Sequence, residues 1–319
     1  MDEPALQIIR PGLFTTVQDL GRSIGEELGV PAGGAMDPRS LQAANILVGN
    51  ARSAACLEIT LSGPVLRFLG DCRIAVCGAV FAMELDGSPA PANSVWNARD
   101  GQSLTFGRCL NGARAYLAIS GGFAVPEVLG SRSTYTPGEF GGLAGRCLCE
   151  GDVLHRELAQ RPELRHSIAT SIRFAGQPPV QVRALRGPQY SWFGSGATEA
   201  FWSTEFTVSA RSDRSGMRLG GASIPSNRAT SSMISEPIPL GTVQVSPDGA
   251  PTILTADRPT IGGYPKIVTV ICPDMPAIAQ CRPGDTLRFV EVTLDEAYEA
   301  AHQTERELRT LAWAVAHLL

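Results

Sequence analysis

Lysine is nearly absent from this sequence of 319 residues. Of the 27 basic residues, 26 are arginine and one is Lys266. Charged residues make up only 18% of the chain, and the formal net charge is −4. Because no basic tract or stripe is present that could contact a phosphate backbone, we do not expect a nucleic acid partner.

Signals for a membrane or for export are also missing. No apolar run reaches the roughly 18 residues that a membrane-spanning helix needs. The first residues, MDEPALQIIRPG, lack the basic and then apolar order of a signal peptide. We therefore expect a cytoplasmic protein without a membrane partner.

Three further absences limit the chemistry. The sequence has no Gly-x-Ser-x-Gly elbow, no Gly-x-x-x-x-Gly-Lys-Ser/Thr loop and no dinucleotide fingerprint after a strand, so no familiar nucleotide site is expected. None of the four histidines has a Gly-flanked setting, which argues against histidine catalysis and histidine-ligated zinc. The eight cysteines form no Cys-x-x-Cys pair and mostly lie in apolar runs, so we predict buried free thiols and no metal site.

Turn-forming residues, in contrast, are plentiful, with 34 glycines and 23 prolines. Short apolar or alternating runs such as LQIIRPG, CRIAVCGA and RAYLAISGG are closed by Gly, Pro, Asn or Asp, which is typical of strands. One helix is expected from Asp37 as N-cap, through Pro38, to Gly49 as C-cap. The sequence therefore predicts a mainly β protein with a few helices.

Residues 157–180 mix charge with Ser, Thr, Gly and Pro, and they are the predicted boundary between two domains. We place an N-terminal β domain at residues 1–175, a C-terminal β domain at residues 176–292 and a terminal helix at residues 293–319. A glycine turn that feeds a strand recurs as RDGQSLTFG, CEGDVLHRE and RPGDTLRFV. This recurrence fits either ordinary hairpins or two related β domains.

The terminal helix is predicted to be amphipathic. Thr293 and Glu296 form a capping box at its start. Apolar residues recur every seven positions from Leu294 to Leu318, which indicates one buried face. This face fits packing on the helix's own domain or pairing with another chain, and the sequence leaves both open.

Polar residues in Gly- and Pro-flanked turns, and one glutamate in an apolar strand, are the candidates for a ligand site. Taken singly, each is more often a turn residue or a surface group. The candidates are Gln18, Asp19, Arg22, Asp37, Glu58, Asp213, Arg214, Gln244, Asp257, Arg258, Tyr264 and Lys266.

Lys266 is the strongest of these candidates. It follows a Gly-Gly pair that lets the backbone approach a ligand, an aromatic residue and a proline that fixes φ. A lysine ammonium is a compact charge that can approach one oxygen, whereas an arginine guanidinium is a wide fork that always stays charged. We interpret this position as a site for an anion, or a developing oxyanion, in a tight pocket.

The same motifs resemble a known family. GLFTTVQDLGR, GVPAGGAMDP, AANILVGN, LEITLSGP, SDRSGMRL, VQVSPDGAP and ADRPTIGGYPKI occur in the order and at the spacing of the 5-oxoprolinase C-subunit family. This family is also called the biotin-dependent carboxyltransferase or allophanate hydrolase subunit 2 family. The resemblance runs over about residues 8–297. It departs from the family's pattern at Ser23-Ile24-Gly25, at Gly33 and at Ile261.

The resemblance implies two cyclophilin-like β-barrel domains and a paired partner, the B subunit of 5-oxoprolinase. Together with a separate A subunit, such pairs open 5-oxoproline (pyroglutamate) to glutamate in an ATP-dependent reaction. The resemblance thus implies one subunit of an ATP-hydrolysing hydrolase that acts on a cyclic amide. Biotin is carried on a lysine flanked by methionines, whereas Lys266 lies between Pro265 and Ile267, so no covalent biotin is expected on this chain.

Residue type and motif position together suggest roles for the candidates. Lys266 and Arg258 would neutralise developing negative charge, and Asp257 would complete the catalytic set. The substrate-binding residues would be Gln18, Asp19, Arg22, Asp37, Gln244, Tyr264, Asp213 and Arg214.

Two alternative functions remain open from the sequence. One is carboxyl transfer to or from urea or another small amide, with carboxybiotin carried on another protein. The other is regulation, in which the chain needs only its pairing surface to bind a kinase-inhibitor-type relative of the B subunit.

Overall fold

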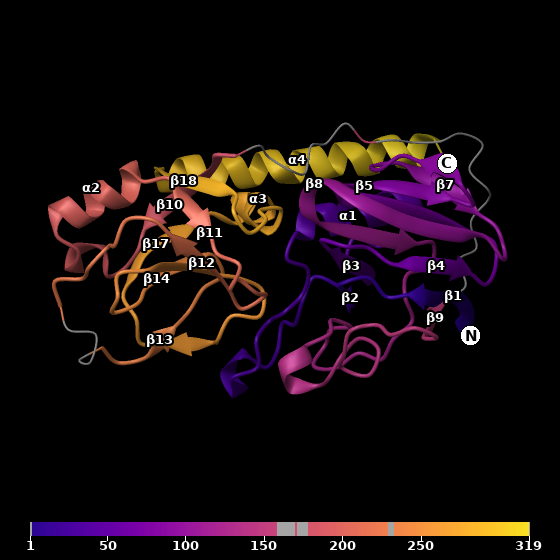
Figure 1. The fold of residues 1–319 in the computed structure, drawn as a ribbon, viewed down its shortest axis with the longest axis horizontal. Helices are drawn as coiled ribbons and strands as arrows, with labels where there is room; N and C mark the ends of the chain where they lie inside the picture. Colours follow the sequence, from indigo (N-terminus) through magenta and orange to yellow (C-terminus); the bar gives the residue numbers. More distant parts are fainter. Residues whose placement is uncertain (1, 158–169, 171–177, 229–232, 319) are drawn as a thin grey trace. The chain divides into compact units, whose positions relative to one another are not determined.

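The computed structural model describes residues 2–157, 170, 178–228 and 233–318, and the chain divides into two compact units. Unit 1 comprises Met1–Ser23, Gly33–Ala175 and Glu305–Leu319, and unit 2 comprises Ile24–Ala32 and Gly176–Thr304. Figure 1 shows that both units are built mainly of strands, as the sequence predicts. The predicted boundary at residues 157–180 lies largely outside the described residues, so the domain limits stay a prediction.

Unit 1 is built on a nine-stranded antiparallel sheet. Strands β2, β3, β8, β4, β1 and β9 follow one another in that order, and β5 pairs with β6, β7 and β8. The long pair β5 and β8 runs from Ile74↔Ile119 to Leu85↔Leu104. The strands are β1 (Asp2–Arg10), β2 (Phe14–Gln18), β3 (Cys56–Thr60), β4 (Val65–Phe68), β5 (Cys72–Leu85), β6 (Ser88–Ala90), β7 (Val95–Ala98), β8 (Ser103–Ile119) and β9 (Val153–Glu157).

The sheet of unit 1 is buried on both faces. Because successive side chains of a strand point to opposite faces, Ile74 and Val76 of β5 join one apolar cluster while Ala75 and Cys77 join another. Helix α1 (Pro38–Val48) contributes its apolar residues to the second cluster. Its stripe of Leu and Ala at 3–4 spacing therefore covers the face of the sheet that carries Cys77.

Local signals at the ends of α1 explain where this helix begins and ends. The Asp37 carboxylate accepts a hydrogen bond from the Ser40 backbone N–H, and Pro38 occupies the first turn. Gly49 ends the helix in the left-handed conformation, with φ of 77°. The predicted N-cap, first-turn proline and C-cap are all confirmed. A short 3-10 helix, η2 (Thr136–Gly138), lies further along unit 1.

Unit 2 contains a closed barrel in the order β10, β17, β14, β15, β12, β11 and β18. Strands β10 and β18 pair in parallel, and the other neighbouring pairs are antiparallel. The strands are β10 (Val180–Arg186), β11 (Phe206–Val208), β12 (Gly216–Gly220), β14 (Thr242–Val245), β15 (Pro251–Leu254), β17 (Lys266–Val270) and β18 (Thr286–Glu291).

Aromatic residues fill part of the core of unit 2. Phe201 and Phe289 stack with ring centroids 4.6 Å apart, and Phe206 packs against both. Outside the barrel, β13 (Glu236–Pro237) pairs with β16 (Ile261–Gly262) as a two-stranded ribbon. Among the described residues, unit 2 includes the short helices η1 (Glu26–Leu28), η3 (Tyr190–Trp192), α2 (Ser195–Ser203), η5 (Cys272–Asp274) and α3 (Met275–Ala279).

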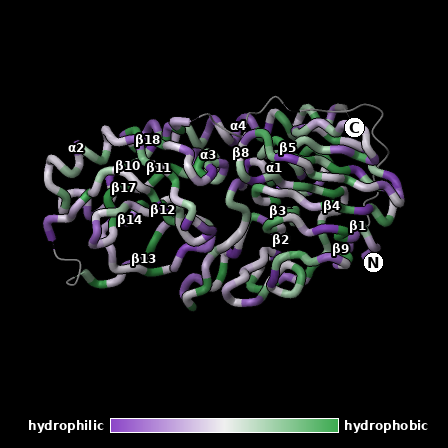
Figure 2. The backbone as a smooth tube through the Cα atoms, in the orientation of Figure 1, coloured by the Kyte–Doolittle hydropathy of each residue, from purple (hydrophilic) through white to green (hydrophobic). Residues whose placement is uncertain are grey.

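The terminal helix α4 (Leu294–Leu318) starts at the predicted capping box. The Thr293 N–H donates to the Glu296 carboxylate at 2.7 Å, and the Glu296 N–H donates to the Thr293 hydroxyl at 3.3 Å. Figure 2 shows hydrophilic and hydrophobic residues alternating along the helix, as expected for an amphipathic segment.

One face of α4 is buried within unit 1. Leu308, Leu311 and Val315 join the apolar cluster that contains α1. For these three residues, the packing interpretation of the seven-residue repeat is confirmed. Leu294 at the start of the repeat is exposed, as is Trp313 on another face. A role of α4 in association with another chain stays a prediction.

The cysteines only partly match the prediction of buried free thiols. All eight are free, and burial raises the pKa of the Cys72 thiol to about 12. Cys149 and Cys272 are exposed, so the prediction of burial is wrong for these two, which lie in turn-rich segments. Within the described part of the chain, no helix combines the length and apolar character that a membrane crossing requires.

Candidate functional site

Lys266 is buried at the start of β17 and forms an ion pair. Its side chain is only 3% exposed, and its Nζ lies 2.9 Å from Oε2 of Glu236. The Glu236 side chain, on β13, is 45% exposed. The ammonium beside it lowers the pKa of the Glu236 carboxyl. Lys266 is therefore buried, and its neighbouring anion is a residue of the same chain, so the tight pocket for a ligand anion stays a prediction.

Gln189 connects the two members of this ion pair. Its Nε2 lies 3.1 Å from Glu236 Oε2, and its Oε1 accepts a hydrogen bond from the Lys266 backbone N–H at 3.2 Å. Gly187 lies directly against the same strand, because a Cβ there would be 2.3 Å from the Lys266 carbonyl oxygen. The sequence contains this turn as GPQ, yet the residues predicted from the sequence included neither Gln189 nor Glu236.

Gln244 and Tyr264 lie next to Lys266. Gln244 of β14 stands opposite Lys266 of β17 in the barrel, and its Nε2 is 3.4 Å from the Tyr264 carbonyl oxygen. A Cβ on Gly262 would lie 2.9 Å from Gln244 Nε2 and 2.6 Å from Ile238 Cδ1. Gly262 thus permits close packing around Gln244, whereas the sequence suggested that this glycine pair lets the backbone approach a ligand.

Arg258 is held by a backbone carbonyl and by a carboxylate. Its Nε donates to the Ile238 carbonyl oxygen at 2.8 Å, and its Nη2 lies 2.8 Å from Glu26 Oε1. Burial lowers the pKa of the Arg258 guanidinium, and the charge of Glu26 opposes this shift. Because Lys266 and Arg258 each have their own carboxylate, the described geometry does not join them into one cation cluster.

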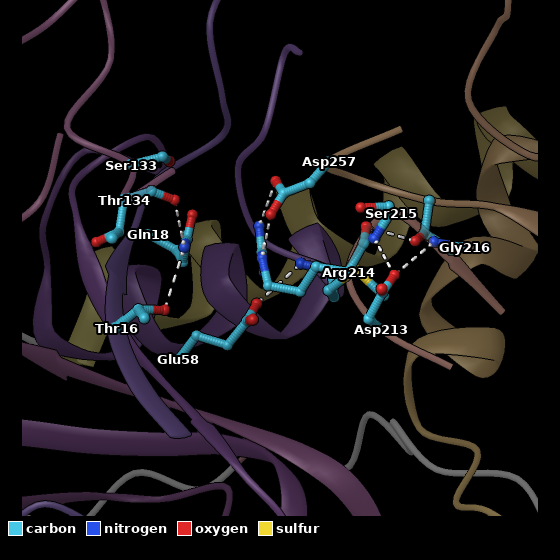
Figure 3. A network of polar contacts seen from close by, with 12 residues as sticks. Thr16, Gln18, Glu58, Ser133, Thr134, Asp213, Arg214, Ser215, Gly216 and Asp257 are labelled. Atoms are coloured by element: carbon cyan, nitrogen blue, oxygen red, sulfur yellow. Dashed lines mark hydrogen bonds and ion pairs between the residues drawn. The ribbon is translucent and has the colours of Figure 1, made fainter. Parts of the chain in front are cut away.

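Asp257 pairs with Arg214 rather than with Lys266 or Arg258. Arg214 donates to Asp257 from Nε at 2.8 Å and from Nη2 at 3.1 Å, in the two-pronged geometry visible in Figure 3. Asp213 closes the adjacent turn, since its Oδ1 accepts from the N–H groups of Ser215 at 2.8 Å and Gly216 at 3.1 Å. Both aspartates thus fix the conformation of this part of unit 2.

Gln18 on unit 1 carries an acceptor without a partner among the described residues. Its Nε2 donates to Thr16 Oγ1 and to the Thr134 carbonyl oxygen, each at 3.1 Å (Figure 3). Its buried Oε1 accepts no hydrogen bond in the described structure. Because the Thr134 carbonyl oxygen can only accept a hydrogen bond, the Gln18 amide nitrogen must face it. This fixes the orientation of the Gln18 amide and therefore the direction of Oε1.

Asp19 is surrounded by hydrogen-bond donors. Its Oδ1 accepts from the Ser131 hydroxyl at 2.6 Å, from the Ser133 hydroxyl at 2.5 Å and from the Gly21 N–H at 2.8 Å. Its Oδ2 accepts from the Arg132 N–H at 2.6 Å. With four donors, this carboxylate ties the segment after β2 to residues 131–133.

Arg22 and Asp37 are also fixed by their surroundings in unit 1. The Arg22 guanidinium lies over the Phe140 ring, 4.7 Å from its centroid, and donates to the Ser133 carbonyl oxygen. Asp37 caps α1. The Arg22 contacts belong to the same part of unit 1 as Gln18 and Asp19, so the motif TTVQDLGR and the segment 131–140 form one polar region.

Glu58 and Tyr116 form a second polar pair in unit 1. The Glu58 Oε2 accepts from the Tyr116 hydroxyl at 2.6 Å and from the Met36 N–H at 2.9 Å. Burial and the nearby Glu58 charge raise the pKa of Tyr116 well above its ordinary value. The phenol therefore stays protonated and donates to Glu58 throughout the physiological pH range.

Comparison with known proteins identifies the family. The model of the carboxyltransferase domain, subdomain A and B, matches residues 28–291. The chain belongs to this family. It is 39% identical to the 5-oxoprolinase C subunit of Haemophilus influenzae, over 91% of this chain and 92% of that protein. It is 37% identical to the 5-oxoprolinase C subunit of Escherichia coli, over 97% of this chain and 98% of that protein.

A solved structure of a larger protein is similar to almost the whole chain. The Kluyveromyces lactis urea carboxylase superposes with a TM-score of 0.87 at 31% identity, covering 98% of this chain. This chain spans only 29% of that urea carboxylase chain. The similarity thus concerns one part of a larger enzyme.

In this carboxyltransferase-family chain, a further polar pocket lies within unit 1. The pocket has a volume of about 340 Å³, and its lining includes Asp19, Asn50, Glu127, Arg132 and Glu157. Arg132 pairs with Glu157 at 3.1 Å and lies 3.7 Å from Glu127. Lys266 does not line this pocket, whose wall carries the three carboxylates of Asp19, Glu127 and Glu157 and the one guanidinium of Arg132.

Among the described residues, no group of three or more His, Cys, Asp or Glu side chains could hold a metal ion. The candidate residues of this chain instead provide hydrogen-bond donors and acceptors from their side chains. The Lys266 ammonium and the Gln244 amide can donate to an oxygen, and the Gln18 amide oxygen can accept from an N–H. Lys266 and Gln244 belong to unit 2 and Gln18 belongs to unit 1, so each unit offers its own groups to a ligand.

Proposed function

We propose that this chain is the C subunit of an ATP-dependent 5-oxoprolinase, which opens 5-oxoproline to glutamate together with the A and B subunits. The observation that carries this proposal is the similarity to two proteins named as C subunits of 5-oxoprolinase, over 92% and 98% of their lengths. The proposal includes a cytoplasmic location and a cyclophilin-like fold for both units, of which unit 2 has the closed barrel and unit 1 the nine-stranded sheet.

Opening a five-membered lactam requires activation of its amide. Attack on the amide carbon places negative charge on the carbonyl oxygen, and a fixed cation or N–H donor stabilises that charge best when it is already in position. Lys266 is buried and held in one place by Glu236, so it meets this requirement. In this proposal, Lys266 stabilises the developing oxyanion, and Gln244 and Tyr264 position the substrate next to it.

The other predicted residues have supporting parts in this proposal. Arg258 and the Asp257–Arg214 pair support the same unit, and Asp213 closes its turn. The unpartnered oxygen of Gln18 is a candidate acceptor for a substrate N–H, with Asp19, Arg22 and Asp37 fixing the surrounding segments. ATP is used by the complex, and this chain holds neither covalent biotin nor a metal ion.

Carboxyl transfer to urea or another small amide is a second candidate. It is favoured by the similarity to a urea carboxylase over 98% of this chain. In carboxyl transfer a urea nitrogen would attack the carboxyl carbon of carboxybiotin, and biotin would leave with negative charge on its ureido oxygen. Lys266 would then stabilise that oxygen rather than the oxygen of an attacked amide. Carboxybiotin would have to arrive on another protein.

Reconstitution separates the two candidates. The purified chain is mixed with the A and B subunits, ATP and 5-oxoproline, and glutamate is measured over time, with each protein omitted in turn. We expect glutamate only when all three proteins are present, because no phosphate-binding loop occurs in this sequence. Glutamate release that does not need this chain would refute the proposal. Carboxylation of urea in the presence of carboxybiotin would support the second candidate instead.

A further inference from the structure

The ion pair between Lys266 and Glu236 is asymmetric. The lysine side chain is 3% exposed, while that of the glutamate is 45% exposed. Removing an ammonium from water favours its neutral form, and an opposite charge within about 4–6 Å favours its charged form. The position of the buried Lys266 ammonium therefore depends on whether its partner carboxylate stays in place.

The charged groups around Lys266 single out Glu236. The facing strand β14 contributes the neutral Gln244, and the turn after β10 contributes the neutral Gln189. Neighbouring strand β10 carries Arg186, which is paired with Glu291 at 2.5 Å. Among the described residues, Glu236 is the carboxylate that is paired with the Lys266 ammonium.

Glu236 reaches Lys266 from outside the barrel. It lies on β13, a strand of two residues whose partner is β16. So short a ribbon cannot by itself fix a side chain, and Gln189 supplies the connection. The Gln189 side chain donates to the Glu236 carboxylate. The Gln189 backbone N–H donates to the Lys266 carbonyl oxygen at 3.3 Å.

The pair still leaves hydrogen-bonding capacity at the lysine. An ammonium has three N–H donors, and one of them points to Glu236. Two donors remain for a ligand oxygen without displacement of the carboxylate. An internal counter-ion and a bound ligand are therefore compatible at the same Nζ.

We propose that Glu236 and Gln189 are positioning residues for Lys266. Glu236 is the counter-ion that holds the buried ammonium in place and aimed at the ligand, and Gln189 holds that carboxylate against β17. This assignment rests on the proposed function for its catalytic meaning. The lowered pKa of the Glu236 carboxyl is consistent with it, because the carboxylate stays ionised wherever the lysine is charged.

The single lysine makes a direct test possible. An amine-specific acylating reagent modifies only Lys266 and the N-terminal amine, and mass spectrometry of peptides separates the two. The rate of modification of Lys266 is measured from neutral to strongly alkaline pH in Glu236→Gln, Gln189→Ala and the unaltered chain. The matched control is Glu291→Gln, which removes one carboxylate from the exposed ion pair with Arg186 on the same barrel.

We expect Glu236→Gln to increase the rate at neutral pH by about 10-fold or more, because the buried amine then loses the opposite charge that pairs with it. The increase should vanish at strongly alkaline pH, where the amine is neutral in every variant. Gln189→Ala should give a smaller increase, and Glu291→Gln none. An increase of equal size at all pH values would mean greater exposure and would refute the counter-ion role, as would no increase.

Turnover of the complex with the A and B subunits provides the second readout. In Glu236→Gln, the alkaline limb of the rate profile should move to lower pH, and Glu236→Asp should restore part of the profile. If modification changes but the profile does not move, Glu236 controls the charge of a lysine that the reaction does not use, and the positioning role is refuted. If no complex turns over 5-oxoproline, the proposed function fails, while the modification rates still decide the counter-ion role.

Discussion

Asp19 in unit 1 and Asp257 in unit 2 are both buried aspartates from the predicted site, but their charges are stabilised differently. Asp19 accepts hydrogen bonds from two serine hydroxyls and two backbone N–H groups. Asp257 receives two bonds from the guanidinium of Arg214. One carboxylate is held by neutral dipoles, and the other by a cation.

The same contrast extends to the neighbouring residues. In unit 2, Lys266 pairs with Glu236 and Arg258 pairs with Glu26. In unit 1, Gln18 and Glu58 are bonded to hydroxyl, carbonyl and N–H groups. Ion pairs depend on both partners and can be broken by removing one, whereas a hydrogen-bonded carboxylate loses its donors one at a time.

The largest expected effect is on the stability of unit 2. Asp257→Ala leaves the guanidinium of Arg214, which is 10% exposed, without this carboxylate. Removing one member of a buried pair typically costs about 3–5 kcal/mol. Chemical denaturation should show this loss. The double variant with Arg214→Ala should cost less than the sum of the single variants, and additive losses would show that the pair does not act as a unit.

Replacing Lys266 should reduce turnover while leaving folding almost unchanged. Loss of one preorganised donor commonly costs about 2.7–4 kcal/mol of transition-state stabilisation, or 10²–10³ in rate. Lys266→Arg should fail almost as badly as Lys266→Ala, since a planar guanidinium does not fit the space of an ammonium held by Glu236. Turnover of the reconstituted complex is the measurement, and the melting temperature is the control. A fully active arginine variant would contradict the role of Lys266.

The elements whose signals are local were predictable from the sequence. The caps of α1 at Asp37 and Gly49 lie within one segment, as do the capping residues Thr293 and Glu296 of α4. The strands were predictable from alternating apolar runs, because each run also lies within one segment. Each such signal depends on residues that are only a few positions apart in the sequence. It can therefore be recognised without knowing the fold.

The partners of the site residues were not predictable in the same way. Glu236 is 30 positions from Lys266, and Arg214 is 43 positions from Asp257. No spacing relates them, because a barrel brings its strands together according to topology. The segment around Glu236, SEPIP, also has no periodicity that would mark a strand. For this reason the sequence indicated an external anion at Lys266, whereas the structure places Glu236 there.

Asp19→Asn should have a smaller effect than Asp257→Ala. The substitution keeps one acceptor oxygen. The new amide nitrogen, however, is a donor and faces other donors, which lose their acceptor. Hydrogen bonds to charged groups contribute about 1.5–3 kcal/mol to stability. We expect a loss of stability in this range for unit 1, measured by chemical denaturation. Added salt should change this loss little, because the donors are neutral. A strong salt dependence would show that Asp19 is paired with a charge, against the comparison with Asp257.

The smallest expected effect concerns an ion pair in unit 1 that is exposed to solvent. Comparing it with the buried pair of Asp257 and Arg214 separates the effect of burial on stability from the effect of pairing. Arg52 lies 2.8 Å from Glu305, and the two side chains are 33% and 38% exposed. Arg309 is 2.7 Å from the same carboxylate. Exposed pairs contribute about 0.2–1 kcal/mol, so Glu305→Gln should destabilise the chain only within that range near neutral pH.

The pH dependence of this small effect has a defined sign. Hydrogen bonds from Arg52 and then Arg309 lower the pKa of Glu305 from 4.5 to about 2. A depressed pKa means that the stabilisation is complete above pH 4.5 and is lost as the pH falls toward about 2. The difference in unfolding free energy between Glu305→Gln and the unaltered chain should shrink over this interval. The matched control is Glu199→Gln on α2, which removes one exposed carboxylate that does not belong to the Arg52–Glu305 ion pair. An equal pH dependence in both variants would attribute the effect to net charge rather than to the ion pair.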